Sequence, residues 1–105
     1  MAKITLGLIM ALSLAGAAFA QDAAAGKTVF ASKCVVCHGA DGAGKTSIGK
    51  SLNIKDLHSA EVQKMSDADL KSAITNGKNK MPPSKGKITE VQLNDVVAYV
   101  RQLGK

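Results

Sequence analysis

The sequence predicts an all-α domain with three main helices and long connecting loops. Apolar residues recur at helical spacing near the C-terminus, and no segment alternates polar and apolar residues as a strand would. Helix-capping residues precede each main helical segment. Loops as long as residues 39–56 and 78–88 are unusual in so small a domain unless they wrap around a bound group.

The first twenty residues resemble a secretory signal peptide. A short basic start precedes an uncharged run over residues 4–17 and the small-x-small sequence Ala18-Phe19-Ala20. This run is shorter than the roughly 20 residues of a membrane-spanning helix. We therefore expect residues 1–20 to be cleaved, although an uncleaved anchor is the alternative. Residues 21–105 would then form one exported domain without stable membrane insertion.

The expected mature domain is short of large apolar side chains. Its only aromatic residues are Phe30 and Tyr99, and it contains no tryptophan. Small secreted domains usually compensate for a weak core with disulfides or a metal. The composition therefore favours a bound prosthetic group that fills the core. The scarcity of aromatic residues and the absence of a dense basic run argue against nucleic-acid binding.

The first expected helix covers residues 23–34. Asp22 is a suitable N-cap, and Val29 and Phe30 lie on a different side from Lys27 and Lys33. Residues 39–56 are rich in glycine at their start and are predicted as a loop. A short helix is expected within residues 57–65.

Two further helices have clear start and stop signals. Ser66 can cap a helix that ends at Asn76-Gly77, where the backbone readily turns. Consecutive prolines exclude regular structure in the basic segment that follows. The sequence TEVQ, which starts at Thr89, is a capping box and predicts the last helix over residues 90–103.

The chemistry is concentrated in the sequence Cys34-Val35-Val36-Cys37-His38. Residues three apart on a helical turn lie on one face, so both thiols can reach the two vinyl groups along one haem edge. The histidine that follows can bind the iron, and this spacing is the attachment pattern of c-type haem. We expect one covalently attached haem c, with thioether bonds to Cys34 and Cys37 and with His38 as the proximal ligand.

Three other uses of these residues are less favourable. A disulfide between Cys34 and Cys37 would close a very small loop and stabilise the chain little. A thioredoxin-like thiol pair would need a βαβ unit, and no strands are predicted. A zinc site needs four ligands, and the motif supplies only three.

Met81 is the preferred candidate for the sixth iron ligand. It lies in a loop stiffened by Pro82 and Pro83, so its thioether can be aimed at a metal, and His/Met ligation raises the reduction potential. His58 would give bis-histidine ligation instead. Met65 is a third candidate, although a methionine more often fills gaps in a core. An open sixth site is the remaining alternative.

The chain resembles the class I monohaem cytochromes c of bacteria, including the c6-like soluble carriers, over essentially the whole expected domain. The resemblance rests on residues 26–30 (GKTVF), 34–39 (CVVCHG), 76–83 (NGKNKMPP) and 95–100 (DVVAYV). It implies that the first and last helices cross at Gly26, with Phe30 packed against Val96 and Tyr99. Family members often carry a proline whose carbonyl accepts the N–H of the proximal imidazole. Residues 39–53 contain none, so a backbone carbonyl within residues 44–48 is expected to serve instead.

The function expected from these features is outer-sphere transfer of single electrons, without enzymatic activity, by a periplasmic monomer. A photosynthetic lumen would also suit an exported carrier. Acidic partners could be steered by lysines near the haem edge, namely Lys33, Lys78, Lys80, Lys85 and Lys87. Two alternatives are a subunit docked in a larger redox complex and a ligand-binding sensor or peroxidase-like enzyme.

Overall fold

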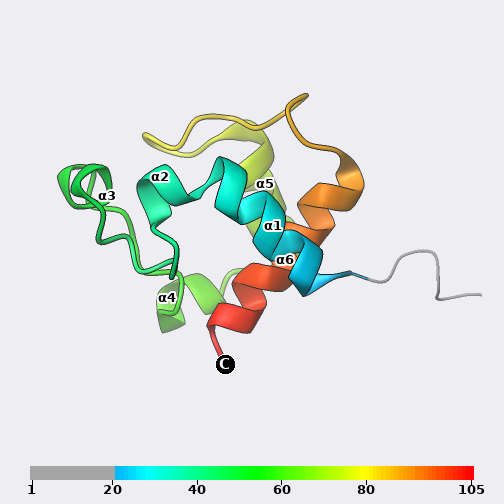
Figure 1. Ribbon diagram of the computed structural model, residues 1–105, viewed down its shortest axis with the longest axis horizontal. Coiled ribbons are helices and arrows are strands. Elements are labelled where there is room, and N and C mark those ends of the chain that lie inside the picture. Colours follow the sequence, from blue (N-terminus) through cyan, green and yellow to red (C-terminus); the bar gives the residue numbers. More distant parts are fainter. Residues whose placement is uncertain (1–20) are drawn as a thin grey trace, which may run out of the picture.

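The computed structural model describes residues 21–105, and the expected signal peptide lies outside these residues. In this part of the chain the elements are α1 (Ala23–Lys33), α2 (Val35–His38), α3 (Ser47–Ser51), α4 (Ala60–Gln63), α5 (Asp67–Asn76) and α6 (Glu90–Leu103) (Figure 1). The only extended pairing within residues 21–105 is an isolated bridge between Lys78 and Met81. The predicted all-α class, with α1, α5 and α6 as its main helices, is confirmed.

Helices α1 and α6 cross in direct contact, although they lie at opposite ends of the domain sequence (Figure 1). Gly26 is buried at the crossing, where an added Cβ would collide with the backbone carbonyl of Asp95. The rings of Phe30 and Tyr99 pack next to it with centroids 5.2 Å apart and planes inclined by 58°. The predicted close approach at Gly26 and the aromatic contact are therefore present.

The predicted caps begin the three main helices. The side chain of Asp22 accepts a hydrogen bond from the Ala25 N–H at 3.0 Å, and Ser66 accepts one from the Asp69 N–H at 3.0 Å. Thr89 and Gln92 form the reciprocal capping box. These bonds satisfy N–H groups that have no partner within their own helix, which fixes where each helix starts.

The short helices differ from the sequence-based expectation. The first helix is interrupted at Cys34, so α1 ends one residue earlier than expected and α2 is a separate turn. The helix expected within residues 57–65 is confined to Ala60–Gln63. Helix α3 lies inside the segment expected to be a loop. Its start is capped by Thr46, whose hydroxyl accepts a hydrogen bond from the Gly49 N–H.

The hydrophobic core is small, as the composition predicted. One cluster joins Val62 and Leu70 to three valines of α6, and Val97 is the largest side chain that is fully enclosed within the described residues. Apart from Val97, five of the seven buried apolar side chains in the described residues line a cavity. None of the helices in residues 21–105 combines the length and the hydropathy that a membrane span requires.

Candidate haem-attachment site

A cavity of about 490 Å³ lies between the crossed helices and the two long loops. This volume falls within the range of about 300–1,000 Å³ that is usual for cofactor and ligand sites. Its apolar walls include Phe30 from α1, Leu70 from α5, and Val96 and Val100 from α6. The core side chains therefore pack against one another on one side and face the cavity on the other, as expected if a prosthetic group completes the core.

The motif residues Cys34, Cys37 and His38 all line this cavity. Cys34 occupies the break between α1 and α2, and its carbonyl accepts the His38 N–H at 3.0 Å. This hydrogen bond closes one helical turn and brings both thiols and the imidazole to the same wall. Both cysteines are free thiols, so the disulfide alternative is not formed.

The titration behaviour of these groups suits ligation better than thiol redox chemistry. Burial, assisted by the neighbouring Cys37, raises the pKa of Cys34 to about 11. Redox-active Cys-x-x-Cys sites instead lower a thiol pKa. Burial lowers the pKa of His38, which keeps the imidazole neutral at pH 7 with a lone pair available for a metal.

The two ring nitrogens of His38 differ in their surroundings. Nδ1 is sealed from solvent and has no hydrogen-bond partner among the described residues. The expected backbone carbonyl from residues 44–48 is therefore not in place. Gly44 instead donates its own N–H to the His38 carbonyl at 2.8 Å. With Nδ1 buried, Nε2 is the nitrogen left to bind a metal in the cavity.

Met81 also lines the cavity and is held by its loop. Lys78 and Met81 exchange two backbone hydrogen bonds of 3.1 Å and 2.9 Å. The end of the same loop is fixed to α5, because the Ser84 N–H donates to the Ile74 carbonyl at 2.9 Å. The thioether is therefore presented by a constrained backbone, as the prolines in the sequence predicted.

The other two candidates for the sixth ligand are placed less well. His58 does not line the cavity; its Nδ1 lies 2.7 Å from a carboxylate oxygen of Asp56, and its side chain is 43% exposed. Met65 does line the cavity, but it also packs against the hydrophobic cluster around Val97. Within residues 21–105, no group of three or more His, Cys, Asp or Glu side chains is placed to hold a metal ion, so the zinc alternative lacks a ligand set.

Sequence reasoning placed Lys78 and Lys80 near the haem edge but did not identify the other polar residues that line the cavity. Asn53 and Lys55 line it from the segment after α3, and the Met81 loop adds Lys78, Asn79 and Lys80. The Lys55 ammonium also pairs with Glu61 at 3.0 Å. Amide and ammonium donors suit the two propionate carboxylates of a haem. The cavity thus combines two thiols, an imidazole and a thioether with apolar walls and cationic groups. This lining fits a haem, and the site defines a monohaem c-type cytochrome.

Comparisons with known proteins agree with this class. A family profile described as cytochrome c oxidase, cbb3-type, subunit III matches residues 21–100. Cytochrome c6 of Synechocystis sp. is 40% identical over 88 residues, which cover 84% of this chain and 71% of the relative. Cytochrome c6 of Gloeothece citriformis is 38% identical over 95% of this chain and 93% of the relative. A solved c-type cytochrome, KustC0563, superposes with a TM-score of 0.70 at 33% identity, over 76% of this chain and 98% of that one.

The chain belongs to the class I cytochromes c and is related to cytochrome c6. This membership confirms the predicted fold, the haem c cofactor and the role as an electron carrier.

Proposed function

We propose that this chain carries single electrons on one haem c that is bound through thioethers to Cys34 and Cys37, with His38 and Met81 as axial ligands. The observation that carries the proposal is their position: all four side chains line one largely apolar cavity. Attachment adds each S–H across a haem vinyl group, so the thiol proton and sulfur both end on the haem and no oxidant is needed. When bound, the haem supplies an iron that alternates between the ferric and ferrous states.

The residues of the chain would hold that iron from two sides of the cavity lining, through His38 and Met81. The neutral His38 imidazole and the Met81 thioether would fill both axial positions, and apolar walls from α1, α5 and α6 exclude water. A site closed in this way favours outer-sphere electron transfer over chemistry on a bound substrate. Methionine ligation also raises the reduction potential relative to a second histidine. We therefore infer a carrier and not an enzyme.

Replacing Met81 tests the ligand assignment. In Met81→Ala, the reduced-minus-oxidised visible spectrum should change and the reduction potential should fall, while the haem stays attached. Ferrous wild-type protein should not bind carbon monoxide, whereas the variant should. Met65→Ala and His58→Ala serve as matched controls and should keep the wild-type spectrum. A spectrum unchanged by the loss of Met81 would overturn the assignment.

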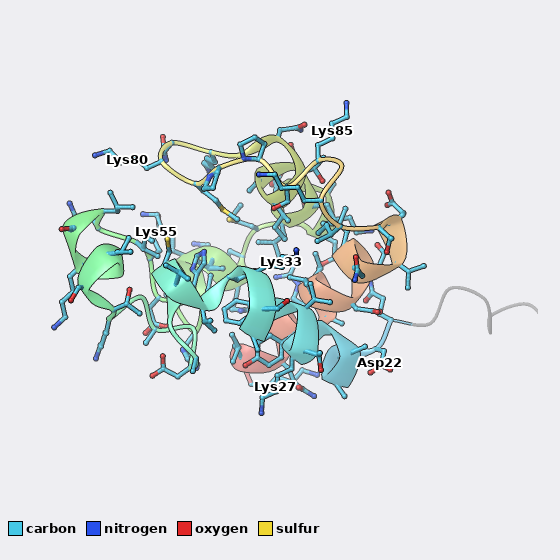
Figure 2. All side chains as sticks on the ribbon, turned by 45° about the horizontal axis from the view of Figure 1, so that its top comes forward. Asp22, Lys27, Lys33, Lys55, Lys80 and Lys85 are labelled. Atoms are coloured by element: carbon cyan, nitrogen blue, oxygen red, sulfur yellow. The ribbon has the colours of Figure 1, made fainter. Side chains whose placement is uncertain are left out.

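Acidic redox partners are supported by the distribution of charge. The whole chain has a formal charge of +6, and the Met81 loop carries exposed lysines near the cavity. Figure 2 shows Lys80 and Lys85 extending outward from this loop, with Lys27 on another side of the molecule. Steered association weakens as salt screens charge over about 8–10 Å. Electron exchange with an acidic partner should therefore slow with salt. Lys80→Gln should reduce this dependence more than the control Lys27→Gln.

Export is the second part of the proposal. Cleavage after Ala20 would release the domain into the periplasm, or into a photosynthetic lumen, as a monomer. Mass spectrometry of the protein from its native compartment tests the site. A mature mass that begins at Gln21 and includes one haem is the expected result. A retained N-terminal segment would support an uncleaved anchor.

A second candidate function is a permanent role as a subunit of a larger redox complex. It is favoured by the matched family profile, whose description names a subunit of an oxidase. Gel filtration of the natively expressed protein separates the two functions. A free carrier should elute as a monomer, whereas a subunit should co-elute with its complex.

A further inference from the structure

The backbone around His38 is restrained on both sides of the residue. The carbonyl of Cys37, in the peptide group before His38, accepts a hydrogen bond from the Thr46 hydroxyl at 3.0 Å. The carbonyl of His38, in the peptide group after it, accepts the Gly44 N–H at 2.8 Å. Both peptide planes that meet at the His38 Cα are therefore fixed by the segment that leads into α3.

Thr46 links this turn to a second element. Its hydroxyl donates to Cys37 and also accepts the Gly49 N–H at 2.9 Å, which caps α3. A hydroxyl has one proton and two lone pairs, so it can make both bonds at once. Gly49 allows the approach, because a Cβ there would lie 2.6 Å from the Cys37 carbonyl oxygen. The half-buried Thr46 side chain is thus the polar connection between α3 and the haem-attachment turn.

The His38 ring has no comparable restraint of its own. A metal-binding histidine usually donates its second ring nitrogen to a carboxylate or carbonyl, which sets the ring orientation. The Nδ1 atom of His38 has no such partner among the described residues. Its nearest aromatic neighbour, Phe30, has its centroid 6.0 Å away and is inclined by 45°. The orientation of the imidazole therefore depends on the backbone that carries it.

We propose that Thr46 is a positioning residue for the proximal ligand: its hydroxyl fixes the peptide group between Cys37 and His38 and so sets the angle at which the imidazole meets the iron. This inference rests on the proposed axial role of His38. Without the hydroxyl, the Cys37 carbonyl loses its partner and the peptide plane gains freedom to rotate. The iron–histidine bond then becomes less uniform, and electron transfer requires more rearrangement of the site.

The test compares holoproteins that differ only in capping hydroxyls. Thr46→Val removes the hydroxyl with little change of shape, and Thr46→Ser retains it. Thr89→Val removes the same kind of cap from α6, at an exposed position outside the residues that line the cavity. For each protein we would measure thermal stability, reduction potential and electron self-exchange rate. The iron–histidine stretching band is recorded by resonance Raman spectroscopy on the ferrous Met81→Ala form of each.

We expect Thr46→Val to shift the iron–histidine band and the reduction potential and to slow self-exchange. Thr46→Ser should restore wild-type values. Thr89→Val should lose thermal stability but keep the wild-type band and potential. If Thr46→Val accumulates only without haem, while Thr46→Ser and Thr89→Val are loaded normally, the hydroxyl is needed to form the turn and the proposal is supported.

Two results would overturn the proposal. If Thr46→Val is destabilised but has the band, potential and exchange rate of the wild type, Thr46 only caps α3 and the proposed electron carrier still stands. If the wild-type protein shows no c-type haem spectrum, or His38→Ala leaves the iron–histidine band unchanged, the proposed function fails and the role of Thr46 fails with it.

Discussion

The crossing of α1 and α6 and the wall formed by the cavity loops (residues 39–59 and 77–89) are stabilised in different ways. At the crossing, protein touches protein: Gly26 lies against the Asp95 backbone, and Phe30 packs on Tyr99. The cavity loops are held mainly by backbone hydrogen bonds, such as those from Leu57 to Gly42 at 2.9 Å and from Ile54 to Gly49 at 3.0 Å. Five of their apolar residues line the cavity, namely Leu52, Ile54, Leu57, Met81 and Pro82.

This difference means that the chain alone stabilises one region, whereas the other region depends on the cofactor. The two ends of the domain can contact each other without haem at Gly26 and Tyr99, although Phe30, Val96 and Val100 also line the cavity. In the middle of the chain, backbone polar groups are hydrogen-bonded to one another, but apolar surface remains uncovered until another molecule binds. We therefore expect the crossing to resist loss of haem better than the cavity loops do.

The strongest test of this division removes the haem. In the double variant Cys34→Ala/Cys37→Ala, the cofactor can no longer be attached, and a cavity of about 490 Å³ is left uncovered. The loss should be comparable to the whole stability of a small domain, about 5–15 kcal/mol. Circular dichroism during heating should show no cooperative transition, and amide exchange should be fastest in the cavity loops.

The single variants Cys34→Ala and Cys37→Ala are the matched controls, since each can retain one thioether and should lose less stability. A double variant that unfolds as cooperatively as the haem-containing wild type would contradict the division between the two regions.

The next effect concerns the crossing alone. Gly26→Ala places a methyl group against the Asp95 carbonyl, where the backbone of α6 leaves no space for it. Overpacking of this kind costs about 1–3 kcal/mol or more. Chemical denaturation of the holoprotein should reveal this loss while the visible spectrum stays unchanged. Ala24→Ser, at an exposed position of α1, should have almost no effect. A spectral change in Gly26→Ala would mean that the crossing and the haem site are not separable.

A smaller effect is expected where the two regions are joined. The side-chain amide of Gln63 donates to the carbonyls of Leu57 and Val100, at 2.8 Å and 2.9 Å, and so ties the cavity wall to α6. Gln63→Ala leaves both acceptors without this donor and should cost about 1–3 kcal/mol. Denaturation midpoints would measure the loss. Gln102→Ala removes an exposed amide from the end of α6 that Gln63 contacts, and it should hardly change the denaturation midpoint. Equal midpoints for the two variants would exclude the proposed link.

The smallest effect lies at an exposed turn in the cavity loops. The backbone N–H and the side chain of His58 lower the pKa of Asp56 below its usual value. Because the folded-state pKa is lowered, the stabilisation is present above the unfolded-state pKa and is lost as pH falls through the folded-state value. Asp56→Asn should therefore be slightly less stable than the wild type above about pH 4, neutral pH included, and the difference should shrink along the acid limb as pH falls. An unchanged acid limb would show that the turn is not coupled to folding.

The crossing was easier to predict from sequence than the cavity loops, for a physical reason. Capping residues and helical periodicity act locally, so α1, α5 and α6 could be placed from their own residues. Helix α3 is too short for periodicity to appear, and only Thr46 signals its start. The attachment motif is contiguous, and the structure places its two cysteines and its histidine on the cavity. The backbone on either side of His38 is held by hydrogen bonds from Gly44 and Thr46, which lie outside the motif. The spacing of residues in the sequence does not predict these contacts.

The hydrogen bond from the Asp22 N–H to the buried Asp95 carboxylate, 2.9 Å long, constrains the order of events during maturation. Only Gln21 separates the predicted cleavage point from this bond. A processing peptidase must grip an extended stretch of chain on both sides of the bond it cuts, and a residue already fastened to α6 cannot be gripped. If the proposed cleavage after Ala20 takes place, it must therefore precede the docking of α1 on α6.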